Sequence, residues 1–289
     1  MWFVYALLGA FGKSYSGYFR KKIAKSVSGG MYIWVSYTLI LVVMGPFMAW
    51  HFDELLSSFI NIPLIVVGAA IAYMLGTQLN LEALKREDLS YTAPLNAFVP
   101  VFTLLVAGLF LSESPPRFGI AGIVIIVVGA YIISIKPEKV KWYSPLKRMF
   151  TSTGAVLSLC VALCYAVHTV LMKVMSNGGY DVFVITYATT LVGWILLLYV
   201  PILRRGELRS IGKSDKIAVL GGAVTSFAGS FFHILAIANT YTSYATAVRR
   251  LDAVISVVLG WRYLKERHIL IKLVGSMVMT LGAVLLAVS

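Results

Sequence analysis

The sequence is poor in charged residues, in cysteine and in catalytic motifs. Asp, Glu, Lys and Arg make up 13% of its 289 residues, about half of what soluble domains carry. The two cysteines, Cys160 and Cys164, are four residues apart in one apolar run, where a disulfide is geometrically unfavourable and two packed thiols are expected. No zinc-protease, P-loop or serine-hydrolase motif and no carboxylate cluster occurs. These shortages exclude a soluble enzyme and an ATP-driven pump, and we expect no cofactor and no metal ion.

Hydrophobic residues, in contrast, are abundant. They make up 59% of the chain, and the mean hydropathy is +0.85. A membrane-spanning helix needs about 20 mainly apolar residues, and continuous runs of this kind exclude the alternating pattern of a transmembrane β-barrel. The sequence therefore predicts an all-α polytopic membrane protein with ten transmembrane helices, over residues 2–19, 31–50, 62–84, 91–111, 117–136, 153–173, 181–203, 216–239, 241–262 and 269–288.

The net charge of +13 is distributed as membrane topology requires. The loops after the first, third, fifth, seventh and ninth predicted helices, with their flanks, hold 20 of the 25 Lys and Arg, whereas the opposite side holds only Arg117 and Lys173. Basic residues are concentrated in cytoplasmic loops. We therefore expect a multi-pass protein of the cell (inner) membrane with both termini outside, the lipid bilayer as its surroundings and no nucleic acid partner.

The two halves of the chain repeat each other. Residues 62–133 align without a gap on 215–286, and 13 of the 72 pairs are identical. The matches include Ser90-Tyr91 with Ser243-Tyr244, Glu113 with Glu266, and pairs of glycines eight or seven residues apart that let membrane helices approach closely: Gly68, Gly76, Gly122 and Gly129 with Gly221, Gly229, Gly275 and Gly282. Because each copy has five helices, the second enters the membrane upside down. The predicted units are a first repeat, a polar linker with two prolines and a second repeat, over 1–136, 137–152 and 153–289.

The segment from Ser90 to Pro100 leads to Glu113 and to the glycines at 119, 122 and 129. Together with its repeat over 243–283, this pattern resembles the paired EamA repeats of the drug/metabolite transporter superfamily. The resemblance covers essentially the whole chain. It implies two inverted five-helix repeats around a central cavity and export or exchange of small metabolites. In the second copy, Arg249, Arg250 and Asp252 replace the Asn96, Ala97 and Val99 of the first, so the resemblance does not carry over a substrate.

Arg249 and Arg250 are the leading candidates for substrate binding. They lie near the centre of the ninth predicted helix, where a charged side chain costs at least about 2.5–3.5 kcal/mol. Asp252 is three residues from Arg249, so one intrahelical pair is available. Arg250 would then meet an anionic group of the substrate. Alternatively, Asp252, Glu82, Asn80 or backbone carbonyls satisfy both arginines.

Further polar residues within the predicted helices are weaker candidates. Cavity-lining side chains are expected at Tyr91, Thr92, Asn96, Gln78, Asn80 and Thr246. Proton coupling is expected, if anywhere, at His233, His168 and Glu82, although a lone membrane histidine is more often a packing residue. We expect Lys13 to extend its amino group toward the basic end of its helix, and Glu113 and Glu266 to cap neighbouring turns.

The function that these features favour is secondary transport of a small polar, anionic or zwitterionic, organic metabolite by alternating access. The missing catalytic motifs argue against an enzyme. A lipid-handling flippase and a non-transporting membrane scaffold remain alternatives, and monomer and homodimer are both open.

Overall fold

A computed structural model describes residues 1–111, 119–135, 150–204, 206–207, 212–238, 248–266 and 268–288, and every regular element in these ranges is a helix. The helices of the first half are α1 (Trp2–Ile23), α2 (Gly29–Met48), α3 (Phe52–Asn61), α4 (Pro63–Arg86), α5 (Leu89–Leu95), the 3-10 helix η1 (Asn96–Phe98), α6 (Val99–Leu111) and α7 (Gly119–Ser134). Those of the second half are α9 (Thr153–Asn177), α10 (Val182–Leu196), α11 (Tyr199–Leu203), α13 (Lys213–Ala238), α15 (Leu251–Leu264) and α16 (Ile269–Val288).

Four helical stretches are long and apolar enough to cross a membrane: Gly29–Met48, Pro63–Arg86, Thr153–Asn177 and Phe183–Leu203. Helices α1 and α13 are also long, with 22 and 26 residues, but both carry several charged residues. A helix rises 1.5 Å per residue, so 20 residues cover the thickness of a bilayer core. The chain is thus an all-helical membrane protein.

Helix boundaries follow local sequence signals. The hydroxyl of Ser28 accepts a hydrogen bond from Met31 N at the start of α2, and the carboxylate of Asp181 accepts one from Phe183 N at the start of α10. Both side chains satisfy donors that the first helical turn leaves free. Pro63 is the first residue of α4, where its missing N–H removes no helical bond.

Helix α3 was not predicted from the sequence. It covers 10 residues between α2 and α4, and a search for apolar runs of membrane-spanning length passes over so short a helix. Leu55 is buried in the core that α3 shares with α4 and α10, whereas Leu56 and Ile60 are exposed.

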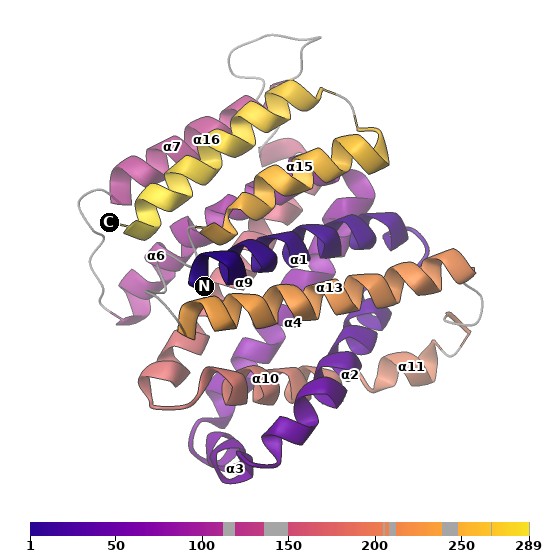
Figure 1. Cartoon of the computed structure of the whole chain (residues 1–289), viewed down its shortest axis with the longest axis vertical. Coiled ribbons are helices and arrows are strands. Elements are labelled where there is room, and N and C mark those ends of the chain that lie inside the picture. The colour runs from indigo at the N-terminus through magenta and orange to yellow at the C-terminus, as the bar shows by residue number, and fades with distance from the viewer. Residues whose placement is uncertain are drawn as a thin grey trace.

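The two halves pack in a reciprocal pattern (Figure 1). Helix α1 lies along α13, and α4 lies along α9; α2 contacts both α13 and α10; and α7 runs beside α16. When each helix is replaced by its counterpart in the other half, the α1–α13 pair becomes the α4–α9 pair, and the α2–α13 pair becomes the α4–α10 pair. The start of α1 and the end of α16 lie toward the same side of the bundle.

Glycines lie where helices cross closely, as the repeated spacing predicted. A Cβ added at Gly229 would lie 2.8 Å from Lys13 N in α1, and one at Gly76 would lie 2.8 Å from the Tyr165 ring in α9. Both distances are shorter than real Cβ contacts. In contrast, a Cβ at Gly68 would make an ordinary 3.4 Å contact with Leu171.

Glycines also lie at the close contact between α7 and α16. A Cβ at Gly275 would lie 2.9 Å from Gly129 O, and one at Gly282 would lie 2.8 Å from Gly122 O. In the sequence alignment Gly122 corresponds to Gly275, and Gly129 to Gly282. Gly275 therefore contacts Gly129, and their counterparts Gly122 and Gly282 contact each other. This reciprocal pairing is the contact pattern of a two-fold interface.

Candidate functional site

Two helix breaks face each other inside the bundle. In the first half, α5 gives way to η1 before α6 begins. Pro100 has no N–H to donate to the carbonyl of Asn96, four residues earlier, so this carbonyl accepts from Val99 N and keeps one lone pair for a further donor. In the second half, residues 248 and 249 are helical, Arg250 is in a turn, and α15 begins at Leu251. The prediction of one continuous helix over 241–262 is therefore wrong at this point.

Arg250 joins the two breaks. Its Nη1 donates to Asn96 O at 3.5 Å, and its own carbonyl accepts from Thr280 Oγ1 at 3.3 Å. Among the described residues, the buried Arg250 Nε and Asn96 Oδ1 have no hydrogen-bond partner. A buried donor and a buried acceptor left without partners are costly. These atoms are therefore available to a polar ligand.

The expected pair between Arg249 and Asp252 does not form. No ion pair links Arg249 to a carboxylate in the part of the chain that the structure describes. The reason is the turn at Arg250, because residues three apart share a face only within a continuous helix. The backbone carbonyl of Asp252 instead accepts from Ser14 Oγ in α1 at 2.9 Å.

Lys13 points into the bundle, so the prediction that it extends to the basic end is wrong. Its Nζ lies 4.9 Å from the centroid of the Tyr165 ring in α9, within the range of a cation–π interaction. The Tyr165 hydroxyl in turn lies 3.3 Å from Thr77 Oγ1 of α4. Lys13 therefore lies between the two halves.

Arg20 was also misplaced by the sequence analysis, which counted it among the loop charges. Its side chain is buried, with 6% exposure. Arg20 lies seven residues after Lys13, two helical turns along the same face of α1, and this periodicity was the signal that could have identified it. Lys13 thus lies within electrostatic range of three further interior cations, Arg20, Arg249 and Arg250, and of the Asp252 carboxylate.

The two histidines flank this cluster. His168 Nδ1 lies 3.0 Å from Ala69 O, and its ring packs 5.0 Å from that of Tyr73. His233 is nearly buried, and its Nδ1 has no hydrogen-bond partner among the described residues.

Most of the other predicted site residues lie elsewhere. Tyr91 is fully buried in a hydrophobic cluster, and Thr92 directs its hydroxyl to the carbonyls of Asp88 and Leu89. Further along α4, Gln78 packs against Gly29 of α2, and Asn80 is buried.

Glu82 lies at the partly exposed end of α4, where it pairs with Lys85 at 3.0 Å and with Arg86 at 2.8 Å. The structure therefore does not bring Glu82 to the histidines with which proton coupling had been predicted. Thr246 and Glu113, and most of the predicted linker over 137–152, lie outside the described residues.

Comparison with known protein families identifies the family of this chain. A sequence model described as "EamA-like transporter family" matches residues 1–135 and again residues 152–288. The chain belongs to the EamA-like transporter family. It is thus a multi-pass membrane transporter and not an enzyme, and the resemblance noted from the sequence is confirmed.

The fold is shared with solved structures. One of them, described only as "Crystal structure of protein", superposes with a TM-score of 0.65 over 97% of this chain and 95% of the other, at 14% sequence identity. At that identity the likeness concerns the fold alone. No curated protein matches the sequence.

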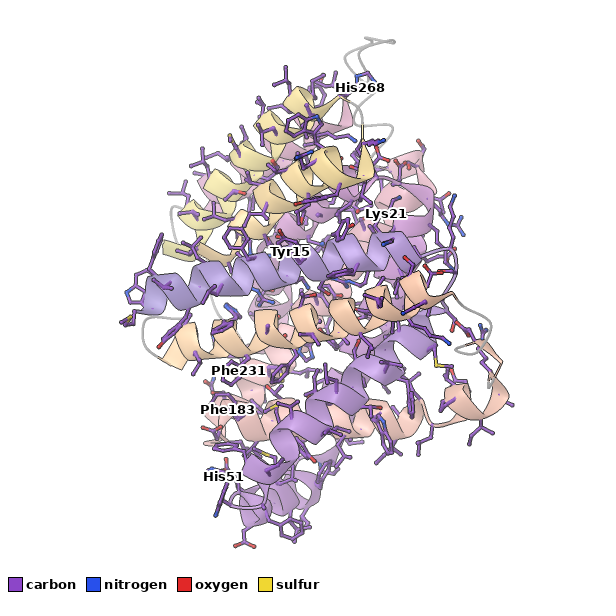
Figure 2. The ribbon with its side chains drawn as sticks, turned by 45° about the vertical axis from the view of Figure 1, so that its right-hand side comes forward. Tyr15, Lys21, His51, Phe183, Phe231 and His268 are labelled. Carbon is purple, nitrogen blue, oxygen red and sulfur yellow. The ribbon has the colours of Figure 1, made fainter. Side chains whose placement is uncertain are left out.

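One end of this EamA-like transporter is held together by charged side chains. We call it the basic end; it carries Lys21, Lys22, Lys25, Lys213, Lys216 and Lys265. Figure 2 shows Lys21 and His268 toward this end, and His51, Phe183 and Phe231 toward the other. Lys21 Nζ donates to Leu84 O and to Glu87 O, both at 2.6 Å, and so ties α1 to the end of α4.

Glu266 caps α5 at the basic end, as the sequence predicted. Its carboxylate accepts from Leu89 N at 2.8 Å and from Ser90 N at 2.9 Å, and also from the Ser90 hydroxyl. Lys272 of α16 donates to Asp88 at 2.7 Å and to Ser90 Oγ at 2.8 Å. The two halves are therefore linked at this end through buried, charge-assisted hydrogen bonds.

Proposed function

We propose that this transporter carries a small organic metabolite with an anionic group, and that Arg250 binds this group where the two broken helices meet. The observation that carries the proposal is the buried Arg250 Nε without a partner, opposite the unpaired Asn96 Oδ1. A guanidinium presents its donors in a planar fork that fits carboxylate and phosphate. Asn96 can contact a neutral polar part of the same molecule.

The surrounding charge favours an anion as well. Lys13 lies within electrostatic range of Arg20, Arg249 and Arg250 and of the Asp252 carboxylate. Every other carboxylate in the described residues lies at or near a helix end or in a loop. Charged groups in a low-dielectric interior are costly without counterions, and a bound anion would supply the missing one.

The proposed transport path uses ten membrane crossings arranged as two inverted repeats. Three observations support this arrangement: the reciprocal helix contacts, the exchanged glycine contacts between α7 and α16, and the two termini on one side of the bundle. Inverted repeats of this kind permit alternating access around a site near the midplane. We place the basic end in the cytoplasm because basic residues accumulate there.

His233 and His168 are the proposed candidates for proton coupling. His233 is favoured because its Nδ1 is buried and unpaired near the cluster, whereas His168 already contacts the Ala69 carbonyl. A flippase or a scaffold fits less well, since neither requires an unpaired guanidinium inside the bundle.

The experiment is uptake into proteoliposomes that contain the purified transporter. A panel of radiolabelled carboxylates, phosphate esters, amino acids and neutral sugars is tested against empty vesicles. We expect accumulation of anionic or zwitterionic members only. Arg250→Ala should abolish this uptake, and Arg250→Lys should reduce it by about tenfold because the planar fork is lost while the charge remains.

Arg262 provides the matched control, because it lies in α15, the helix that Arg250 precedes, but is exposed. Arg262→Ala should transport at the rate of the parent protein. Selective uptake of neutral sugars, or full anion uptake by Arg250→Ala, would refute the proposal.

A further inference from the structure

Arg20 is a buried cation that makes no ion pair with a carboxylate in the described part of the chain. It lies near the end of α1, two turns closer to the basic end than Lys13, and its side chain is 6% exposed. Its neighbour Lys21 reaches two carbonyl oxygens at the C-terminal end of α4, and Lys22 is exposed. Arg20 alone of these three turns toward the interior.

The groups that contact Arg20 in the described part of the chain are a backbone carbonyl and tyrosine side chains. Its Nε donates to Ser16 O of its own helix at the long distance of 3.4 Å. The side chains of Tyr32, Tyr73 and Tyr165 lie within electrostatic range. No ion pair links Arg20 to a carboxylate among the described residues. A guanidinium has five N–H donors, and the groups that the described residues offer to those of Arg20 are a backbone carbonyl and tyrosine side chains.

Lys13 and Arg20 lie two turns apart on the same face of α1, and both are close to Tyr165 of α9. Lys13 Nζ lies over the ring of Tyr165 at 4.9 Å, and Arg20 is close enough to both residues to interact electrostatically. Two like charges that share a buried site repel each other, and an opposite charge placed between them relieves both the repulsion and the loss of hydration. Tyrosine hydroxyls can add hydrogen bonds to such an anion.

This location is distinct from that of Arg250. Ser14 Oγ bonds to Asp252 O, so the start of α15 lies level with the middle of α1. Arg20 is six residues further along α1 than Ser14, which corresponds to about 9 Å at the rise of an α-helix. A small metabolite bound at Arg250 would therefore not reach Arg20 without moving toward the basic end.

We propose that Arg20, together with Lys13 and the hydroxyls of Tyr32 and Tyr165, forms a second oxyanion-binding position between the central site and the basic end. The position receives the anionic group of the substrate as it passes between Arg250 and the basic end. This inference rests on the proposed function, since it takes the ligand to be the same anionic group.

The test measures thermal unfolding of the purified transporter in detergent, with inorganic phosphate titrated against chloride at equal ionic strength. Ligands that bind only the folded state raise the melting temperature. In Arg20→Gln we expect phosphate to bind about tenfold more weakly, because charge-assisted hydrogen bonds are lost. In the absence of phosphate, the same variant should melt no lower than the parent, because it removes a buried charge without a counterion.

The matched control is Lys22→Gln, which makes the same change of charge at an exposed position two residues away. It should leave both the melting temperature and the phosphate response unchanged. Arg20→Lys keeps the charge but loses the fork, and its affinity for phosphate should lie between those of Arg20→Gln and the parent. Methyl phosphate should act like inorganic phosphate if the position accepts an anionic group attached to an organic molecule, and it should be inactive if only the free ion fits.

The outcomes separate this inference from the proposed function. If Arg250→Gln weakens the phosphate response and Arg20→Gln does not, the second position is refuted and the central site stands. If Arg20→Gln weakens the response and Arg250→Gln does not, the central site is refuted instead. No phosphate response in the parent contradicts both. Unfolding of Arg20→Gln, with an unchanged phosphate response in Arg20→Lys, would show that Arg20 is a structural residue.

Discussion

Replacing Gly229 with Ala should destabilise the transporter, although alanine is the better helix former. In a helix, Gly→Ala is worth about 0.8–1 kcal/mol in favour of Ala. At Gly229, however, the added Cβ would lie 2.8 Å from Lys13 N and 3.0 Å from Gly12 C. Both atoms belong to the backbone of α1, so no change of rotamer can relieve the clash.

The size of the effect follows from the distance that α1 and α13 must move apart. Ordinary contact begins at 3.4 Å, so the close crossing must open by several tenths of an ångström along two long helices. Overpacking of this kind costs about 1–3 kcal/mol. We therefore expect Gly229→Ala to lower the free energy of unfolding by up to about 2 kcal/mol after the gain in helix propensity, and Gly229→Leu to lower it further.

Gly68 is the matched control on α4. A Cβ there would meet only Leu171 Cδ1 at 3.4 Å, so Gly68→Ala should gain the helix propensity without a clash. The assay is thermal unfolding in detergent, followed by the fluorescence of the purified protein. Gly229→Ala should melt below the parent and Gly68→Ala at or above it. Equal melting of the two variants, or a higher melting temperature for Gly229→Ala, would refute the close crossing.

Two further predictions concern topology and the cap of α5. In a protein without native cysteines, Asp53→Cys should react with an impermeant maleimide in intact cells, and Ser214→Cys should react only after lysis. Both positions are exposed. The reverse result would invert the proposed orientation. Glu266→Ala should lower the free energy of unfolding by about 1–3 kcal/mol, because it leaves Leu89 N and Ser90 N without their acceptor, whereas Lys272 keeps Asp88 as its partner. Glu82→Ala, which removes two solvent-exposed ion pairs, should lower the free energy of unfolding by less than about 1 kcal/mol. Chemical denaturation measures the free energy of unfolding of both variants. A similar decrease in the two variants would show that the cap contributes no more than a surface ion pair.

Local patterns predicted most of the helices and the duplication. The helices lie close to the predicted apolar runs, because the need to bury about 20 apolar residues acts on each segment separately. The glycines at 76 and 229 mark close crossings, as predicted, because only a residue without a side chain permits such an approach. The short helix α3 was missed, since its 10 residues fall below the length that the search recognises.

The candidate site was predicted only in part. Arg249 and Arg250 were recognised because two charges in an apolar run are unusual. The pair between Arg249 and Asp252 was predicted wrongly, because the prediction assumed a continuous helix, whereas the structure has a turn at Arg250.

The sequence by itself determined the properties that depend on composition and period: a helical membrane protein, a repeated chain and the places where helices pack closely. Only the tertiary structure decided which polar groups meet. Arg20 lies beside a basic segment and Lys13 in the middle of α1, yet both side chains turn inward toward Tyr165. The physical reason is that the rotation of each helix about its own axis depends on its contacts with all its neighbours. The sequence of one helical segment does not show which helices those neighbours are.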